Sequence, residues 1–344
     1  MNPHSINSKA ALIGQQRESA WLKRQVMISI IVPVYNEEAG IAKFLIALQK
    51  MMQSLQQPFE IIVVDDGSTD QTLELLAALN ISHLKCIHFS KNFGKEKALT
   101  AGLDRASGHV SLMLDADFQH PLHYIPEFLT VWRLQAMDMV YGLRKNRDQD
   151  PWLRRIATRI FYQLLHWISE VDILDGAGDF RLMDRAVVDA INRFEEHERF
   201  MKGIYAWVGF KTHAIPIDIA HRMDGSSHFS LSMRGLKLAL TAIFSFSDVP
   251  LRIWSILGLL MSSIAFLYGL DIFLDVLLHG SAVPGYATLV LCILFFGGMQ
   301  LLSIGILGEY IGRIFNEVKR RPQYIVSQER GFAKKEEQHP QMTE

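Results

Sequence analysis

Two long uncharged runs near the C-terminal end constrain this chain most, because few folds can accommodate them. Residues 253–270 and 288–308 contain no Asp, Glu, Lys or Arg. Spanning a bilayer takes about 20 apolar residues, and both runs are close to that length. Neither run shows a polar face, which argues against the alternative of two buried core helices. We therefore expect a two-helix transmembrane hairpin over residues 249–312.

Basic residues flank this expected hairpin. They are Arg234, Lys237 and Arg252 before the first run, and Arg313, Lys319, Arg320 and Arg321 after the second. The loop 271–287 between the runs contains neither Lys nor Arg. Because Lys and Arg are enriched on the cytoplasmic side of spans, both flanks are expected in the cytoplasm. The sequence thus predicts a multi-pass membrane protein with a cytoplasmic N-terminal domain and a basic cytoplasmic tail over 313–344.

The segment 231–248 joins that domain to the first run. Its apolar side chains recur at helical spacing: Leu236, Leu240, Ile243 and Phe244. Arg234 and Lys237 lie on another side of the same expected helix. This pattern is typical of an amphipathic helix lying at a membrane interface, and an ordinary surface helix of the soluble domain is the alternative.

Charge and cysteine content exclude several function classes. The 344 residues carry a formal net charge of -1, which gives no signal for nucleic-acid binding. The two cysteines, Cys86 and Cys292, stand far apart in apolar contexts, so neither a disulfide framework nor a zinc site is expected. Residues 1–25 are polar and lack the apolar core of a signal peptide. We expect a flexible extension there, followed by a domain over 26–230.

Residues 26–230 begin with alternating strand and helix patterns. Strands are expected at 27–34, 59–64, 84–89 and 110–114, and helices at 37–55, 71–79 and 95–105. Continuous apolar runs such as 27–34 are typical of parallel strands that are buried on both faces. The pattern predicts an open, mostly parallel α/β sheet, in which ligands bind beyond the carboxyl ends of the strands.

Mostly polar residues stand at or just after the end of each of these four expected strands. The candidates among them are Pro33, Tyr35 and Glu37 at the end of the first, Asp65 and Asp66 after the second, Lys95 after the third, and Asp115, Ala116, Asp117 and Gln119 after the fourth. One such group alone is often turn chemistry, but four groups on one sheet edge favour a single binding cleft. Two carboxylates one residue apart supply the hard oxygen ligands that Mg²⁺ and Mn²⁺ prefer, and these ions commonly hold substrate phosphates. Neither a dinucleotide-binding Gly-x-Gly-x-x-Gly nor a Walker motif is present.

Two later segments carry further candidates. The basic stretch that contains Arg144 and Arg155 is either a solvated helix face or a site for an anionic lipid headgroup. Asp179 follows two glycines and precedes an apolar segment from Leu182 that we expect to be a helix. Its carboxylate therefore either caps that helix or projects into the cleft.

Several short motifs occur in this order along the chain. They are Val-Pro-Val-Tyr-Asn-Glu-Glu (32–38), Val-Val-Asp-Asp-Gly-Ser-Thr-Asp (63–70), Asn-Phe-Gly-Lys-Glu (92–96), Asp-Ala-Asp-Phe-Gln (115–119), Gly-Asp-Phe-Arg-Leu-Met (178–183), Phe-Met-Lys-Gly-Ile (200–204), Trp-Val-Gly (207–209) and Leu-Gly-Glu-Tyr-Ile-Gly-Arg-Ile (307–314). Together they resemble family 2 glycosyltransferases, and more narrowly the polyprenyl-phosphate glycosyltransferases that include the bactoprenol glucosyltransferases. The resemblance covers about residues 27–327 and implies a GT-A fold and an inverting mechanism.

The resemblance also implies roles for individual residues. In the family, residues matching Pro33, Tyr35, Glu37, Asp65 and Asp66 hold the base and ribose of the nucleotide sugar, and Lys95 and Ala116 are further candidates for donor binding. Residues matching Asp115, Asp117 and Gln119 surround a divalent metal, Mg²⁺ or Mn²⁺, and the donor diphosphate. Asp117 and Asp179 are the catalytic candidates, and Arg144, Arg155 and Arg222 are candidates for the acceptor phosphate. The chain departs from the family pattern at His120, where Asp is common, and at His228, where Lys is common.

The expected reaction is transfer of a hexose, glucose from UDP-glucose, to undecaprenyl phosphate for modification of a cell-surface glycan. The expected location is the bacterial inner (cytoplasmic) membrane, with the lipid bilayer as a partner. Transfer of N-acetylglucosamine, mannose or a modified arabinose stays open. So does an inactive membrane scaffold that recruits a flippase. A homo-oligomer, a flippase and a downstream membrane transferase are further candidate partners.

Overall fold

The computed structural model describes residues 25–144, 177–196, 199–218 and 285–332, with isolated positions between 258 and 278. The chain divides into two compact units, one made of residues 1–162, 173–231 and 322–344, the other of residues 163–172 and 232–321. Four sequence predictions lie outside the described residues: nearly all of the extension 1–25, the interfacial helix 231–248, and the acceptor candidates Arg155 and Arg222.

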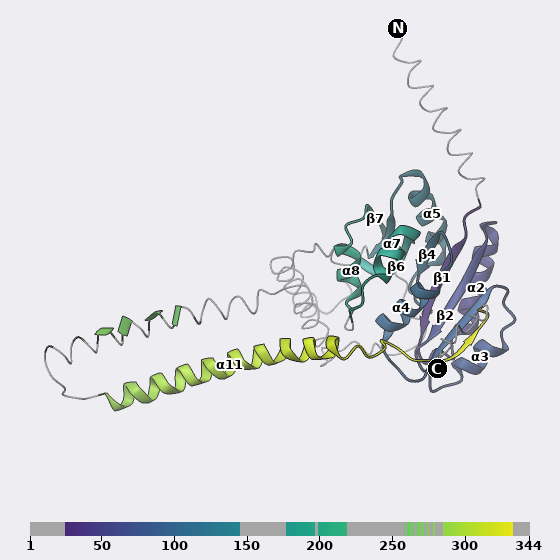
Figure 1. The fold of residues 1–344 in the computed structure, drawn as a ribbon. Helices are drawn as coiled ribbons and strands as arrows, with labels where there is room; N and C mark the ends of the chain where they lie inside the picture. Colours follow the sequence, from purple (N-terminus) through teal and green to yellow (C-terminus); the bar gives the residue numbers. More distant parts are fainter. Residues whose placement is uncertain are drawn as a thin grey trace, which may run out of the picture. The chain divides into compact units, whose positions relative to one another are not determined.

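The described part of the first unit is built on one mixed sheet with the strand order β7-β5-β6-β4-β1-β2-β3-β8 (Figure 1). The strands are β1 (Ile28–Val34), β2 (Phe59–Asp65), β3 (Leu84–Phe89), β4 (Val110–Met113), β5 (Met139–Arg144), β6 (Ala177–Asp184), β7 (Thr212–Ile217) and β8 (Val326–Arg330). Strands β4, β1, β2 and β3 are parallel neighbours, whereas β6 is antiparallel to both β4 and β5. The prediction of a mostly parallel α/β sheet is confirmed.

Helices connect these strands. They are α2 (Ile41–Ser54), α3 (Thr72–Ala78), α4 (Lys95–Arg105), α5 (Ile125–Leu134), α7 (Arg185–Asn192) and α8 (Met201–Trp207), with a short 3-10 turn at Leu122–Tyr124. The predicted strands and helices between residues 27 and 114 are confirmed, with boundaries that differ by a few residues. The largest difference is at α2, which begins at Ile41, because residues 37–40 form a turn closed by the Gly40 N–H on the Glu37 carbonyl at 3.2 Å.

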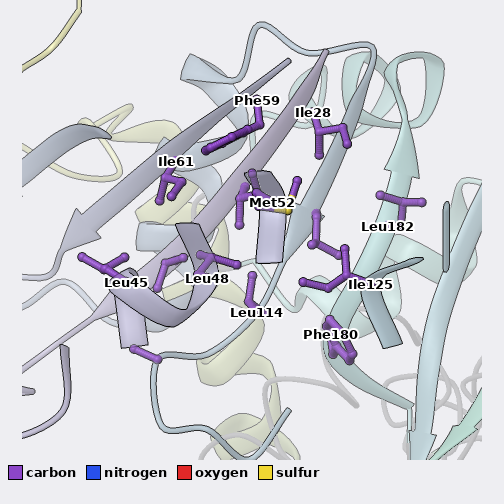
Figure 2. Close-up of a cluster of buried hydrophobic side chains, with 14 of the residues drawn as sticks. Ile28, Leu45, Leu48, Met52, Phe59, Ile61, Leu114, Ile125, Phe180 and Leu182 are labelled. Carbon is purple, nitrogen blue, oxygen red and sulfur yellow. The ribbon is translucent and has the colours of Figure 1, made fainter. Parts of the chain in front are cut away.

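Both faces of the sheet are covered by helices. On one face, the apolar side of α2 packs against alternate residues of β1 and β2, as Figure 2 shows for Leu45, Leu48 and Ile61. On the other face, α4 packs against β1 and β2. The approach is closest at Gly102, where a Cβ atom would lie 2.3 Å from Ile31 Cγ2. This packing holds the first residue of α4, Lys95, at the carboxyl edge of the sheet.

The C-terminal segment returns to the first unit as an edge strand. Strand β8 runs antiparallel to β3. Just before it, the Tyr324 hydroxyl donates to Asp104 Oδ2 at 2.9 Å, and the Tyr324 ring stacks on Phe89 at 4.9 Å between centroids. From the sequence we predicted only a basic cytoplasmic tail over 313–344, and this strand was not foreseen. An edge strand needs no apolar alternation, so the polar sequence Val-Ser-Gln-Glu-Arg gave no signal for it.

The described part of the second unit contains α11 (Tyr286–Val318), which includes the second apolar run. The described positions between 258 and 278 are helical. Within the described residues, no helix has both the length and the apolar character needed to cross a membrane. The two expected transmembrane helices are therefore not seen.

Candidate active site

The loops after the first two strands are bonded to each other at the carboxyl edge of the sheet. The Asn36 N–H donates to Ser68 Oγ at 2.9 Å, and the Thr69 N–H donates to Asn36 Oδ1 at 2.8 Å. Asn36 adopts the left-handed backbone conformation (φ 54°) that this exchange requires. Because β1, β2, β3 and β4 are parallel, their polar ends share this edge, as the sequence predicted.

Asp65 and Asp66, both expected to bind the nucleotide, accept hydrogen bonds from backbone N–H groups of the loops at this edge. Asp65 is buried, and its two carboxylate oxygens contact the Ser68 N–H at 3.0 Å and His88 Nδ1 at 2.7 Å. Asp66 accepts from the N–H groups of Phe93 at 2.6 Å and Gly94 at 2.9 Å. Burial raises the pKa of Asp66. Both carboxylates thus fix the shape of the edge around the site.

Three further donor candidates lie at the end of β1 and on the loop that follows it. Pro33 is still within the strand and half-buried, Tyr35 is 44% exposed, and Glu37 is half-buried. The Glu37 N–H donates to Thr72 Oγ1 at 2.9 Å, which ties this loop to the start of α3. The tyrosine ring is therefore the accessible member of this group.

Lys95 joins two carboxylates that come from different strands. Its ammonium lies 2.7 Å from Asp115 Oδ1, 2.8 Å from Asp115 Oδ2 and 2.7 Å from Asp179 Oδ2. Burial would raise the pKa of Asp179, but the attraction of Lys95, and then of Lys202, outweighs it and lowers that pKa. The side chain of Asp179 is 17% exposed, so an ionised carboxylate remains partly accessible next to Lys95.

Asp179 belongs to a strand, which corrects the sequence analysis. Residues 177–184 form β6, and Leu182 pairs with Leu112 of β4. The expected helix from Leu182 and the capping role for Asp179 are therefore wrong. The cap of the following helix is Asp184, which accepts from the Ala186 N–H at 3.1 Å. Pairing with β4 overrides the apolar pattern that suggested a helix, and it directs Asp179 toward Lys95.

Arg181 lies two residues after Asp179 on β6 and was not identified from the sequence. It is 4% exposed, and its guanidinium carbon lies 4.0 Å from the ring centroid of Tyr205 and 4.9 Å from that of Tyr141. Side chains alternate along a strand, so Asp179 and Arg181 share one face of β6 while Phe180 lies in the core on the other. This alternation within Gly-Asp-Phe-Arg-Leu-Met was the signal that could have identified Arg181.

Glu96 connects α4 to α8, and it too was not singled out from the sequence. Its Oε2 accepts from the Met201 N–H at 3.2 Å. Burial raises the pKa of Glu96 to about 7, with repulsion from Asp179 adding to the rise and Lys95 and Lys202 opposing it. Glu96 and Lys202 lie inside two of the motifs quoted above, but no spacing argument predicts that they meet.

The loop after β4 carries the expected metal ligands. Asp117 Oδ1 accepts from the Gln119 N–H at 3.0 Å, and Ala116 is 4% exposed. No group of three or more His, Cys, Asp or Glu side chains that could hold a metal is found among the described residues. Two carboxylates and an amide nevertheless fit Mg²⁺ or Mn²⁺, because such ions commonly take one or two carboxylates together with substrate phosphates. The donor diphosphate would complete that ligand set.

Two other residues named in the sequence analysis are described by the structure: His120 in this loop and Arg144 at the end of β5. His120 Nδ1 accepts from the Asp115 N–H at 3.4 Å, and its ring stacks on Phe180 at 5.2 Å. Burial lowers the pKa of His120, so the ring is neutral at pH 7. Arg144 is half-buried at the end of β5, next to the pair Leu143 and Ala177 that opens β6. It therefore lies at the same sheet edge as the beginning of β6.

The sequence matches two known family profiles and several named proteins. The family described as "Glycosyl transferase family 2" matches residues 29–191, and "GtrB C-terminal hairpin" matches residues 249–314. The chain is 44% identical to the SfII prophage-derived bactoprenol glucosyl transferase of Shigella flexneri over 301 residues, which is 87% of this chain and 97% of that protein. It is 40% identical to a glycosyltransferase of Synechocystis over 304 residues, 88% of this chain and 95% of the relative.

Among solved structures, one similar fold is glucosyl-3-phosphoglycerate synthase from Mycobacterium tuberculosis in complex with Mn²⁺ and uridine-diphosphate-glucose. It is 18% identical, with a TM-score of 0.44, and the match covers 68% of this chain and 84% of that one. The two sequence relatives are 40% and 44% identical to this chain, and the matches cover 88% and 87% of it. This chain is therefore a glycosyltransferase of family 2, and it belongs with the bactoprenol glucosyl transferases within that family.

Proposed function

We propose that the protein transfers glucose from UDP-glucose to undecaprenyl phosphate on the cytoplasmic face of the bacterial inner membrane. The observation that carries this proposal is the 44% identity to a bactoprenol glucosyl transferase over 87% of the chain. The reaction breaks the bond between glucose C1 and the β-phosphate oxygen of UDP, and it forms a bond between C1 and a phosphate oxygen of the acceptor. UDP leaves, and attack from the opposite face inverts C1.

The donor binds over the ends of β1, β2 and β4 in this proposal. Tyr35 and Glu37 line the base and ribose side, and the braced loops of Asp65 and Asp66 fix its shape. Asp115, Asp117 and Gln119 would hold the divalent metal, which offsets the negative charge that builds on the leaving diphosphate. A rigid, polar edge of this kind stabilises such charge without reorganising during the reaction.

Asp179 takes a role in orientation rather than in proton removal. The acceptor is a phosphate monoester, which is already ionised near pH 7, so its nucleophilic oxygen needs no general base. Lys95 holds Asp179 and Asp115 together at 2.7 Å each, which places the acceptor side of the cleft next to the metal ligands. Arg144, Arg155 and Arg222 are the arginines proposed to meet the acceptor phosphate, since Arg binds phosphate through two parallel hydrogen bonds.

Attachment to the membrane is also part of the proposal. It rests on the apolar runs 253–270 and 288–308, on the basic residues that flank them, and on the match of residues 249–314 to a C-terminal hairpin profile. The segment 231–248 would lie at the membrane surface and keep the cleft near the acceptor's headgroup. A homo-oligomer, a flippase and a downstream transferase are partners that such a reaction can use.

A screen of nucleotide sugars tests this proposal. The full-length protein is purified in detergent and mixed with undecaprenyl phosphate, Mg²⁺ or Mn²⁺, and one nucleotide sugar at a time, and the lipid product is identified by mass. We expect a hexosyl product from UDP-glucose and much less from UDP-N-acetylglucosamine or GDP-mannose. A product formed only with another sugar keeps the reaction class and replaces the donor. No lipid product with any donor overturns the proposal.

A further inference from the structure

A half-buried lysine, Lys202, lies on α8, the helix that packs against β6. Lys202 is the second residue of α8, and its charge lowers the pKa of Asp179, after burial and Lys95 have made their larger contributions. Among the described residues, no carboxylate lies within 4.0 Å of the Lys202 ammonium. Lys95, in contrast, is fully engaged by Asp115 and Asp179. Lys95 is thus ion-paired to Asp179, whereas Lys202 acts on Asp179 by its charge and makes no ion pair with a described carboxylate.

The helix that carries Lys202 is held at two points. Glu96 accepts from the Met201 N–H at 3.2 Å, which fixes the first residue of α8 against the first turn of α4. Tyr205 packs its ring on Arg181 at 4.0 Å, which fixes the next turn against β6. Lys202 and Tyr205 are three residues apart, so they lie on the same side of the helix. Asp179 and Arg181 likewise share one face of β6.

The sheet order separates this position from the donor. The strands run β6, β4, β1, β2 across the sheet. The donor residues Tyr35, Asp65 and Asp66 lie at or just after the ends of β1 and β2, whereas Asp179 and α8 lie across β4 from them. A cation on α8 is therefore separated from the donor loops by β4, and it leaves the donor position free for the nucleotide sugar.

We propose that Lys202 binds the phosphate of the polyprenyl acceptor, and that Glu96 is a positioning residue that holds α8 so that Lys202 faces Asp179. This inference rests on the proposed function and adds a binding residue that the sequence did not indicate. An ammonium is a compact donor of charge-assisted hydrogen bonds to phosphate oxygens. Because α8 packs on β6, which carries Asp179, a phosphate bound to Lys202 would lie on the β6 side of the site, where one of its oxygens could face glucose C1.

Four variants of the full-length protein test this inference. Lys202→Met removes the charge, Lys202→Arg restores a cation, and Glu96→Ala removes the bond to the Met201 N–H. Lys211→Met is the matched control, because Lys211 is exposed just before β7 and its backbone, rather than its ammonium, makes the bond to Asp138 at 3.0 Å. Apparent KM values for undecaprenyl phosphate and for UDP-glucose are measured separately, and UDP binding is measured by calorimetry.

We expect Lys202→Met to raise the KM for undecaprenyl phosphate by roughly 10–100-fold, the range of a charge-assisted hydrogen bond, with UDP affinity unchanged. Lys202→Arg should recover most of that loss. Glu96→Ala should raise the same KM without changing UDP affinity, and Lys211→Met should change neither. An unchanged acceptor KM in Lys202→Met, or an equal rise in the KM for UDP-glucose, overturns the inference. If wild-type protein forms no lipid product, the proposed function fails instead, which is a different outcome.

Discussion

The guanidinium carbon of Arg181 lies 4.0 Å from the ring centroid of Tyr205, in a position that is almost completely buried. Burial lowers the pKa of Arg181, and interaction with Tyr205 and Asp179 opposes that change. A buried guanidinium costs desolvation energy that is recovered only through close partners. Cation–π contacts with the rings of Tyr205 and Tyr141 offset part of this desolvation energy. The ionised Asp179, two residues away on β6, supplies an opposite charge.

Replacing Arg181 should therefore affect turnover more than stability. In Arg181→Met, we expect kcat for glucosyl transfer to fall at least about 10-fold, because Asp179 loses a fixed opposite charge. Stability should change by less than about 2 kcal/mol, since the desolvation of a buried charge is relieved at the same time. Arg181→Lys should give an intermediate kcat. Steady-state kinetics and thermal unfolding of the same preparations measure both, and a large loss of stability with unchanged kcat would contradict this role.

Asp117→Ala tests the metal ligands. We expect the transfer rate to fall on the order of 10²–10³-fold, because one carboxylate that offsets the charge of the leaving diphosphate is lost. The dependence of UDP binding on Mn²⁺ should weaken in the same variant. Glu127→Ala, which removes an exposed carboxylate on α5, is the control and should keep both properties. A near wild-type rate in Asp117→Ala would refute the assignment.

Asp179→Asn keeps the shape of the side chain and removes its charge. Lys95 then keeps its ion pair with Asp115 only. We therefore expect kcat to fall by about 10-fold or more, while the KM for UDP-glucose changes little. Because the acceptor phosphate needs no proton removal, the shape of the pH–rate profile should not change between about pH 6 and pH 8. Loss of the acidic limb, in which the rate falls at low pH as an essential base is protonated, would instead identify Asp179 as a general base.

Glu96 makes stability depend on pH. Its pKa is raised from 4.5 to about 7, chiefly by burial, so the folded state binds a proton more tightly than the unfolded chain does. This contribution is complete below about pH 4.5 and is lost as the pH rises through about 7. In Glu96→Gln, the fall in stability between about pH 5 and pH 8 should be smaller by about 1–3 kcal/mol. Thermal unfolding across that range measures it, and parallel curves for both proteins would contradict the shift.

Tyr324 attaches the C-terminal segment to α4. Tyr324→Phe keeps the stack on Phe89 and removes the hydroxyl that donates to Asp104 at 2.9 Å, so it should cost about 0.5–1.5 kcal/mol. Tyr324→Ala removes the stack as well and should cost more. Hydrogen exchange of the β3 and β8 amides should rise in the same order. Equal protection in all three proteins would show that β8 is held without this residue.

The parts of the fold that follow from local patterns could be predicted. Continuous apolar runs such as 59–64 identified the parallel strands, and the parallel arrangement alone placed Asp65 and Asp115 at one edge. The strand from Ala177 was missed, because Leu182 and Met183 beside an apolar helix fit a helical pattern as well as an alternating one. Only pairing with β4 decides between them.

Contacts between distant segments could not be predicted in the same way. The pairing of Lys95 with both Asp115 and Asp179 depends on how closely α4 packs on β1 and on the register of β6. The same is true of Glu96 and the Met201 N–H, which are 105 residues apart in the chain. Charge and spacing indicate which side chains carry chemistry, but tertiary packing decides which of them meet.

The position of β8 has a consequence for how the protein is made. Strands β1 to β7 are complete at Ile217, but the outer edge of β3 stays unpaired until Val326 has been synthesised. At about 5–20 residues per second, the ribosome needs on the order of 5–20 seconds to cover that interval. An open strand edge is a template for pairing with other chains. A chain whose synthesis stops within the second unit would therefore have a nearly complete sheet in which the outer edge of β3 can pair with other chains and promote aggregation. In the full-length chain, β8 pairs with that edge.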